Sequence, residues 1–361
     1  MSISLEKYLA PPDFSLGDVR DPRVFELDYI PRKIYERKEL PQIMELISLY
    51  LKGSRIPCII WGERGSGKTT TVKAILRELP NALRRVEGYK EVADSVKTVY
   101  VSAREKPTSY QIYQFLTGMK GGIPASVMKE RLKEEKKMIL AVDEADLLKD
   151  DDLLYFIPRE TSIYLILLSR DIRWFTNLDE AVKSSLLPKH VRFNPYTAEE
   201  MDEILTMRAK EGLNYFDPTV VSALAGIVVR DADSDTRVGI RSLYWLGIKR
   251  SWNENALMDT VKESIKEVED FSIRMMNNEE LVVLYLSIKN KQTNRAYEAL
   301  PPRFKMSKAS FLTKLNRLQE MGLINLIKVS QGRIHTIAVQ PLIRHPEIVE
   351  EEIEARGLLG D

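Results

Sequence analysis

Cysteine and histidine are scarce in this sequence, which has one cysteine and three histidines among 361 residues. With Cys58 alone the chain cannot form an internal disulfide, and a zinc site with several thiolates is excluded. The histidines (His190, His335 and His345) are scattered along the chain and add no ligand cluster. Metal sites built on sulfur or on clustered imidazole rings are therefore not expected.

Long hydrophobic runs are also missing. The longest clean apolar run, residues 163–168, is far shorter than the roughly 18 residues that a membrane-spanning helix needs. The first residues lack a basic start followed by an apolar stretch, so we expect no secretion signal. Hydrophobic residues make up 44% of the chain and charged residues 30%, which is typical of folded domains with sizeable cores. We expect a soluble, cytoplasmic protein of two or three domains, with no membrane partner.

Short apolar segments alternate with helical patterns in the first half of the chain. The segments are residues 57–61, 99–101, 138–142 and 163–168, and residues 190–193 are a candidate fifth strand. This alternation predicts an α/β domain with a parallel sheet covered by helices on both faces. We place this core at residues 27–195, after an extended N-terminal arm at residues 1–26.

The second half of the chain changes character twice. Thr197 and Glu200 form a capping box at a helix start, and only helices are expected from there through residues 196–272. Residues 273–345 then predict three helices followed by a β-hairpin, which is the layout of a winged helix. Residues 346–361 are predicted to be an acidic tail.

A phosphate-binding loop is the most specific motif in the sequence. Residues 62–69 read GERGSGKT and match the pattern G-x-x-x-x-G-K-[ST] between an apolar strand and a helix. The glycines let the loop wrap phosphates with its N–H groups, Lys68 reaches the β- and γ-phosphates, and the Thr69 hydroxyl binds Mg²⁺. ATP or ADP with Mg²⁺ is thus the expected ligand. The candidate nucleotide-binding residues are Gly62, Glu63, Arg64, Gly65, Ser66, Gly67, Lys68, Thr69 and Thr70.

Two acidic residues follow the apolar strand at residues 138–142. A carboxylate at the end of a buried strand beside a phosphate loop is placed to hold Mg²⁺, and we assign this role to Asp143 together with Thr69. The next carboxylate, Glu144, is placed to orient an attacking water, so both acids are candidate catalytic residues. Taken without the loop, the same pair is equally typical of a helix cap.

The order of phosphate loop, acidic strand end, helical domain and winged helix resembles the archaeal relatives of the origin recognition complex, the origin-recognition and Cdc-type replication initiators. The resemblance extends over about residues 28–341 and rests on local strings at residues 28–39, 194–200 and 234–237. It implies an AAA+ ATPase core, a helical lid and a C-terminal winged helix. It also implies three adenine-side residues (Tyr29, Ile30 and Arg37) and a catalytic sensor in the lid (Arg237, or else Arg241).

Two departures from the family pattern concern hydrolysis. Arg170 stands where the resemblance implies a polar first sensor, usually asparagine, and Ala181 stands where it implies an arginine finger. Losing donors over the γ-phosphate removes transition-state stabilisation while the loop can still bind nucleotide. We therefore expect tight nucleotide binding with slow hydrolysis. The alternative is that the alignment with the family is shifted. In that case Arg170 or Lys183 supplies the positive charge at the γ-phosphate.

The winged-helix segment is strongly basic. Residues 281–341 contain ten lysines and arginines against two glutamates, which predicts contact with a nucleic-acid backbone, although a solvated surface has the same composition. Short polar side chains on the third predicted helix, residues 307–321 (Ser307, Ser310, Thr313 and Asn316), can add hydrogen bonds to phosphates or base edges. The candidate DNA contacts are Lys308, Ser310, Lys314, Arg317 and Arg333. The resemblance implies a second contact from residues 103–121, for which the candidates are Arg104 and Lys106, or else an ordinary core helix.

These observations predict a nucleotide-switched initiator that recognises double-stranded origin DNA and associates with the nucleoid. The family implies a paralogous initiator and the replicative helicase as partners. Two alternatives remain open, a nucleotide-gated winged-helix transcription regulator and an ATPase motor or loader.

Overall fold

The computed structural model describes residues 16–331 and 334–359 and divides the chain into two compact units. One unit combines the N-terminal residues up to Glu36 with Pro195–Ser264. The other combines Arg37–Asn194 with the residues from Ile265 onward. No helix in the described part of the chain is long and apolar enough to cross a membrane.

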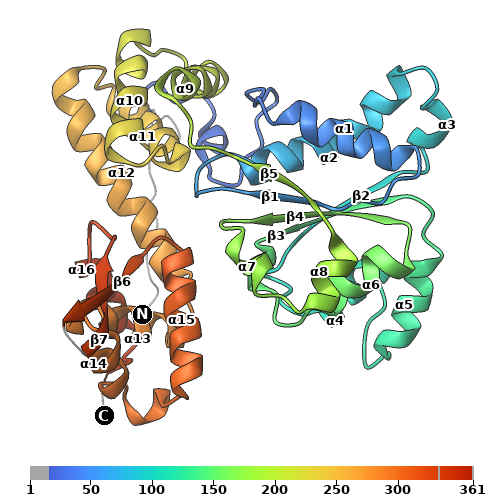
Figure 1. Cartoon of the computed structure of the whole chain (residues 1–361). Coiled ribbons are helices and arrows are strands. Elements are labelled where there is room, and N and C mark those ends of the chain that lie inside the picture. The colour runs from blue at the N-terminus through green and yellow to red at the C-terminus, as the bar shows by residue number, and fades with distance from the viewer. Residues whose placement is uncertain (1–15, 332–333, 360–361) are drawn as a thin grey trace, which may run out of the picture. The chain divides into compact units, whose positions relative to one another are not determined.

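A five-stranded parallel sheet forms the centre of the Arg37–Asn194 segment (Figure 1). The strands lie in the order β2-β3-β4-β1-β5, and every residue of β3 and β4 is buried. The predicted α/β core with a parallel sheet is confirmed, and its candidate fifth strand is the edge strand. The strands are β1 (Cys58–Trp61), β2 (Lys97–Ser102), β3 (Met138–Asp143), β4 (Ile163–Ser169) and β5 (Lys189–Arg192).

Helices cover both faces of this sheet (Figure 1). Alternate strand residues point to opposite faces, so Ile60 packs in one apolar core and Ile59 in the other. One face carries α1 (Leu40–Leu51), α2 (Lys68–Arg85) and α3 (Lys90–Ala93). The other face carries α4 (Ser109–Thr117), α5 (Ala125–Lys133), α6 (Asp152–Glu160), α7 (Arg173–Thr176) and α8 (Glu180–Leu186).

The other unit is helical, as predicted for the lid. It contains α9 (Ala198–Gly212), α10 (Pro218–Asp231), α11 (Thr236–Lys249) and the first half of α12 (Glu254–Arg274). Thr197 and Glu200 make the predicted capping box at the start of α9.

The N-terminal segment is part of this helical unit, so the predicted start of the core at residue 27 is wrong. The Asp18 amide donates to the Gly247 carbonyl (2.8 Å), and the Arg20 amide donates to the Gly212 carbonyl (2.8 Å). Phe25, in the short helix η2 (Pro22–Phe25), is buried at Gly212, where an added Cβ would lie 2.5 Å from the ring. The described part of the predicted arm is therefore folded onto helices far later in the chain, with hydrogen bonds that join residues 190 and 233 positions apart.

The C-terminal segment has the helix and hairpin order expected of a winged helix. Three helices, α13 (Asn278–Asn290), α14 (Thr293–Glu298) and α15 (Lys308–Glu320), precede the antiparallel strands β6 (Ile324–Gln331) and β7 (Ile334–Pro341). A short helix, η4 (Pro302–Phe304), links α14 to α15.

The predicted acidic tail is wrong, because its residues form a packed helix. Helix α16 (Glu347–Ala355) places Ile348, Val349 and Ile353 in the core of the C-terminal segment. Its glutamates lie on the remaining faces of an amphipathic helix, a pattern that the run of acidic letters conceals. Leu358 joins the same core after the helix ends.

Candidate functional site

The phosphate loop connects β1 to α2 in a conformation that requires glycine. Gly62, Gly65 and Gly67 have φ angles of 154°, 70° and 82°. A Cβ at Gly62 would lie 2.2 Å from the Phe193 carbonyl oxygen, which leaves no room for a side chain. The loop predicted from the sequence is therefore formed as expected at the carboxyl end of β1.

Lys68 places its positive charge at the centre of this loop. Its Nζ donates to the Gly62 carbonyl (2.6 Å) and the Glu63 carbonyl (2.8 Å), and lies 3.4 Å from Ser66 Oγ. Lys68 is also the first residue of α2, whose free N–H groups carry partial positive charge. A buried ammonium beside a helix N-terminus is suited to bind an anion.

The remaining loop residues lie close to these contacts. The Ser66 hydroxyl donates to the Glu63 carbonyl (2.8 Å) and is buried. Arg64 and Gly65 are half-buried in the loop, and Thr70 is half-buried in the first turn of α2.

Asp143 and Thr69 meet as predicted. Thr69 Oγ1 donates to Asp143 Oδ2 (2.6 Å), and the hydroxyl of Tyr100, on the adjacent strand β2, donates to the same oxygen (2.7 Å). Burial and the neighbouring Asp143 carboxylate raise the pKa of Tyr100, which keeps its proton in this bond. A hydroxyl and a carboxylate are oxygen donors of the kind that Mg²⁺ prefers.

These residues fit a magnesium ion that is shared with phosphate. Among the described residues, no group of three or more His, Cys, Asp or Glu side chains is placed to hold a metal. Mg²⁺ commonly takes one or two protein ligands and completes its shell with phosphate oxygens and water. Thr69 and Asp143 match that pattern.

Glu144 is held in a salt bridge. Its carboxylate accepts from Arg104 Nη2 (2.6 Å) and Nε (2.9 Å), and Arg170 Nη2 lies 3.8 Å away. Burial alone would raise the pKa of Glu144, but the Arg104 hydrogen bonds and charge, with the charge of Arg170, hold it below its ordinary value. Glu144 also has a left-handed backbone (φ 53°), which is uncommon outside glycine.

Arg104 therefore lies beside Glu144 at the carboxyl end of the sheet, and its predicted contact with DNA stays a prediction. The residue follows Ser102 at the end of β2, the strand that pairs with β3. The sequence contains Arg104, but the pairing of β2 with β3 is what brings it to Glu144. Lys106, the second candidate in this segment, lies over the Phe115 ring (4.7 Å) and 3.9 Å from Glu105.

The predicted adenine-side and lid residues have other partners. Arg37 is buried and donates hydrogen bonds to Glu39, Ser66 and Asn194. In the helical unit, the Tyr29 hydroxyl donates to Glu211 Oε1 (2.5 Å), and this bond raises the pKa of Tyr29. Ile30 is half-buried in the same segment.

The two candidate lid arginines contact their own helix. Arg237 Nη2 donates to Asp235 Oδ2 (2.5 Å), where Asp235 caps α11. Arg241 lies over the Tyr244 ring (5.0 Å) and the Trp245 ring (5.4 Å).

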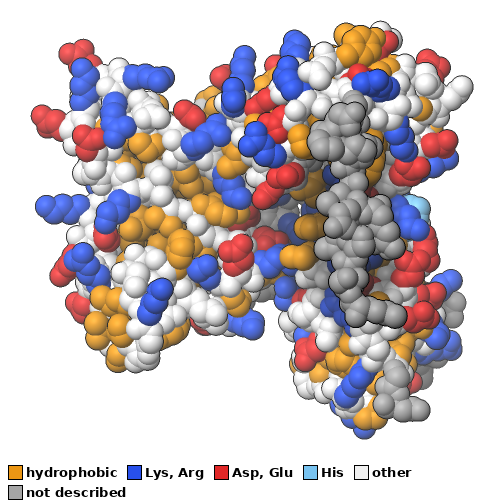
Figure 2. Space-filling view, turned by 180° about the vertical axis from the view of Figure 1, so that it is seen from behind, with side chains coloured by type: hydrophobic (Ala, Val, Ile, Leu, Met, Phe, Trp, Pro, Cys, Tyr) orange, Lys and Arg blue, Asp and Glu red, His pale blue; other side chains and the backbone are white. Residues whose placement is uncertain are grey.

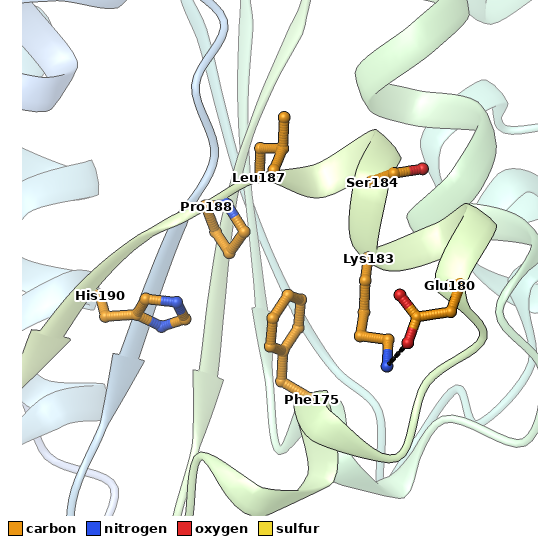
Figure 3. A pocket seen from close by; sticks show the side chains of 7 residues that line it. All are labelled: Phe175, Glu180, Lys183, Ser184, Leu187, Pro188 and His190. Carbon is orange, nitrogen blue, oxygen red and sulfur yellow. Dashed lines mark ion pairs between the residues drawn. The ribbon is translucent and has the colours of Figure 1, made fainter.

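The segment of the expected arginine finger borders a pocket of about 430 Å³. Figure 3 shows Lys183 turned toward Glu180, with which it forms an ion pair of 2.5 Å. Ala181 lies on the same helix, α8, and adds no donor. The lining residues are Phe175, Glu180, Lys183, Ser184, Leu187, Pro188 and His190.

The basic residues of α15 divide into two groups. Lys314 Nζ pairs with Glu279 (2.7 Å) and Arg317 Nη1 pairs with Glu280 (2.8 Å), so both side chains face α13. Glu280 is only 3% exposed, which makes the second pair part of the packing between helices. The predicted DNA contacts Lys314 and Arg317 thus have acidic partners within the protein, and their contact with DNA stays a prediction.

The exposed side of α15 carries other candidates. Lys308, Ser310, Thr313 and Asn316 are exposed, and the last three recur at helical spacing. Thr313 and Asn316 thus continue the exposed side that begins at Ser310, while Lys308 is exposed at the start of the helix. Arg333 lies outside the described residues. Over the face seen in Figure 2, Lys and Arg side chains are interspersed with Asp and Glu.

Known proteins were compared with this chain by sequence and by fold. A family model described as "AAA domain" matches residues 52–169. The ORC1-type DNA replication protein 1 of Sulfurisphaera tokodaii is 25% identical over 351 residues, covering 85% of each chain. The protein of the same name from Aeropyrum pernix is 29% identical over 230 residues, covering 56% of this chain and 57% of that protein.

The similarity extends to solved structures. The Aeropyrum pernix ORC1 protein, solved in complex with DNA, has a TM-score of 0.70 at 24% identity and covers 96% of this chain and 99% of that one. Cdc6p of Pyrobaculum aerophilum has a TM-score of 0.56 at 20% identity and covers 94% of this chain and 100% of that one. The chain is therefore similar over most of its length to an archaeal ORC1-type DNA replication protein, and part of its core matches an AAA domain.

Proposed function

We propose that this protein is a nucleotide-switched replication initiator that recognises double-stranded origin DNA. The observation that carries the nucleotide part is the meeting of Lys68, Thr69 and Asp143 at the carboxyl ends of β1 and β3. ADPNP–ADP complexes of the Aeropyrum pernix ORC2 protein, which has a TM-score of 0.59, support ATP and ADP as ligands.

The residues of the loop divide the work of binding. Lys68 and the loop N–H groups neutralise the β- and γ-phosphates, while Thr69 and Asp143 hold the magnesium ion. Bound Mg²⁺ supplies charge neutralisation of the phosphate oxygens. The three glycines keep side chains out of the space that the phosphates need.

The ion pair between Glu144 and Arg104 favours slow hydrolysis. A carboxylate that orients water must offer a lone pair, but Arg104 Nε and Nη2 already donate hydrogen bonds to the Glu144 oxygens. The lowered pKa of Glu144 also makes it a weaker base. Ala181 offers no donor for the transition state. These features favour a switch that holds its nucleotide over a motor that turns over rapidly.

The exposed residues of α15 are the proposed contacts with double-stranded DNA. The Aeropyrum pernix ORC1 protein was solved with DNA, and this chain shares its fold. Lys308 supplies charge for the phosphate backbone, and the short polar side chains supply hydrogen bonds to base edges. Arg333, outside the described residues, remains a proposed DNA contact. Proposed partners are a paralogous initiator and the replicative helicase.

A footprint on genomic DNA, made with ATP and with ADP, tests this function. We expect protection of a few discrete sites at replication start points, with an extent that differs between the two nucleotides. Protection scattered over promoters would support a transcription regulator instead. Equal protection of all duplexes would contradict sequence recognition.

A further inference from the structure

The guanidinium of Arg37 is buried and joins distant segments of the chain. Its side chain is 2% exposed and pairs with Glu39 through Nε (3.0 Å) and Nη2 (3.2 Å). Nη1 donates to the Ser66 carbonyl (3.2 Å), and Nη2 donates to the Asn194 carbonyl (2.7 Å). The guanidinium carbon also lies 4.9 Å from the centre of the Phe193 ring. We call these five residues the Arg37 cluster.

The cluster lies where the chain passes between its two units. The helical unit ends at Glu36 and resumes at Pro195, so Arg37 and Asn194 are the core residues at these two connections. The hydrogen bond from the Arg37 side chain to the Asn194 carbonyl thus links the two connections. The same side chain reaches the phosphate loop at Ser66.

Ser66 links the cluster to the phosphate-binding lysine. Its hydroxyl donates to the Glu63 carbonyl and lies 3.4 Å from Lys68 Nζ. When Lys68 turns toward a phosphate, the contacts that hold Ser66 change. The Ser66 carbonyl is the acceptor for Arg37, so this change reaches Asn194 through a single guanidinium.

Only arginine fits this set of acceptors. A guanidinium has five N–H donors in a rigid plane, and four of them account for the bonds to Glu39, Ser66 and Asn194. Lysine has a single nitrogen and cannot reach acceptors on three sides with the same geometry. The burial of the cluster keeps water from replacing a lost bond.

We propose that Arg37 is a positioning residue that transmits the state of the phosphate loop to the two chain connections with the helical unit. This inference rests on the proposed nucleotide switch and names the residue that couples its parts. It replaces the predicted role of Arg37 as a direct nucleotide contact. Arg37 acts through Ser66 and Asn194 and touches no reacting atom.

The test measures the distance between the units with and without nucleotide. Fluorophores are attached to cysteines introduced at two exposed positions, Glu91 in α3 and Thr219 in α10. The native Cys58 is buried, which raises the pKa of its thiol to about 12, so it does not compete for the label. In the wild type we expect energy transfer to differ between the nucleotide-free and ADP–Mg²⁺ forms.

In Arg37→Ala we expect this difference to disappear and the Kd for ADP to rise about tenfold, the size of one lost charge-assisted hydrogen bond. Arg37→Lys should restore little of the energy-transfer difference and little of the affinity for ADP. Because Arg37→Ala leaves the Glu39 carboxylate buried, the double variant Arg37→Gln with Glu39→Gln is measured beside it, and the same loss is expected. Glu39→Gln alone keeps the bonds to Ser66 and Asn194 and should respond to ADP.

Arg55→Ala is the matched control, because it removes another arginine that donates to a carbonyl, that of Thr161, far from the loop. It should leave the response to ADP unchanged. A full response in the Arg37 variants would overturn the inference while leaving the switch intact. A wild type that binds ADP without any change in energy transfer would instead overturn the switch on which the inference rests.

Discussion

At the scale of single residues, two adjacent carboxylates are given opposite tasks by their neighbours. Asp143 accepts from two hydroxyls, Thr69 and Tyr100, which are neutral donors that leave its charge available to a metal ion. Glu144 accepts from the guanidinium of Arg104, which neutralises its charge. The proposed magnesium ligand therefore keeps neutral partners, and the proposed water-orienting acid is paired with a cation.

Removing Arg104 should release Glu144. We expect Arg104→Ala to hydrolyse ATP about tenfold faster than the wild type or more, since a freed general base contributes about 10²- to 10⁴-fold in enzymes. Steady-state release of phosphate measures the rate. Lys106→Ala is the control, because it removes a nearby positive charge that does not touch Glu144. A rate that stays at the wild-type level would show that Ala181 and Arg170 alone limit hydrolysis.

The same ion pair should give a pH-dependent stability. Because Arg104 holds the pKa of Glu144 below its ordinary value of 4.5, the pair stabilises the fold above that pH. This contribution is lost as the pH falls through the lower pKa of the folded protein. The wild type should therefore exceed Arg104→Ala in Tm at pH 7, and the gap should shrink below about pH 4. A gap that is constant from pH 7 to pH 3 would contradict the ionic origin of the contact.

At the scale of elements, α15 shows what a basic sequence leaves undetermined. The helix, its cap at Ser307 and its buried face were predictable from local spacing. The partners of Lys314 and Arg317 were not, because Glu279 and Glu280 lie on α13, more than 30 residues earlier. A charge count cannot tell a free cation from one paired across a helix contact.

Arg317→Ala should therefore affect folding more than DNA binding. The substitution leaves Glu280, at 3% exposed, without its ion pair, at a cost of roughly 1–3 kcal/mol. Urea unfolding measures this loss, and adding Glu280→Gln should recover part of it.

By contrast, Lys308→Ala should reduce the salt dependence of DNA binding by about one phosphate contact. If Arg317→Ala reduced the salt dependence as much as Lys308→Ala, Arg317 would be a DNA contact.

Features that depend on neighbouring residues were predictable across the whole chain, whereas contacts between distant elements were not. The phosphate loop and the capping box of α9 were predictable, because each depends on residues within about ten positions of one another. The role of the strand-end carboxylates was predictable only together with the loop, because the acidic pair alone is equally typical of a helix cap. The contacts of Arg104, Arg37 and the N-terminal segment were not, because each depends on which distant elements lie side by side. α16 was missed for another reason: its acidic composition outweighed the helical spacing of Ile348, Val349 and Ile353.

At the scale of the whole molecule, the chain carries its two proposed binding activities on separate segments. The loop and the strand-end carboxylates lie within Arg37–Asn194, and the candidate DNA face lies on α15. The helical unit is joined to the core at residues 36–37 and 194–195, where the Arg37 cluster lies. Nucleotide binding and DNA binding should therefore be separable by mutation.

Lys68→Ala tests this separation. ADP–Mg²⁺ at about 100 times its Kd should stabilise the wild type by roughly 2.7 kcal/mol, enough to raise the Tm by several degrees. The variant should show no such rise, because it lacks the ammonium that faces the phosphates. Its affinity for origin DNA without nucleotide should stay within about threefold of the wild type, as should that of the surface control Lys90→Ala. If Lys68→Ala abolished DNA binding altogether while keeping a wild-type Tm without nucleotide, the two activities would share one site, and the division of the chain proposed above would fail.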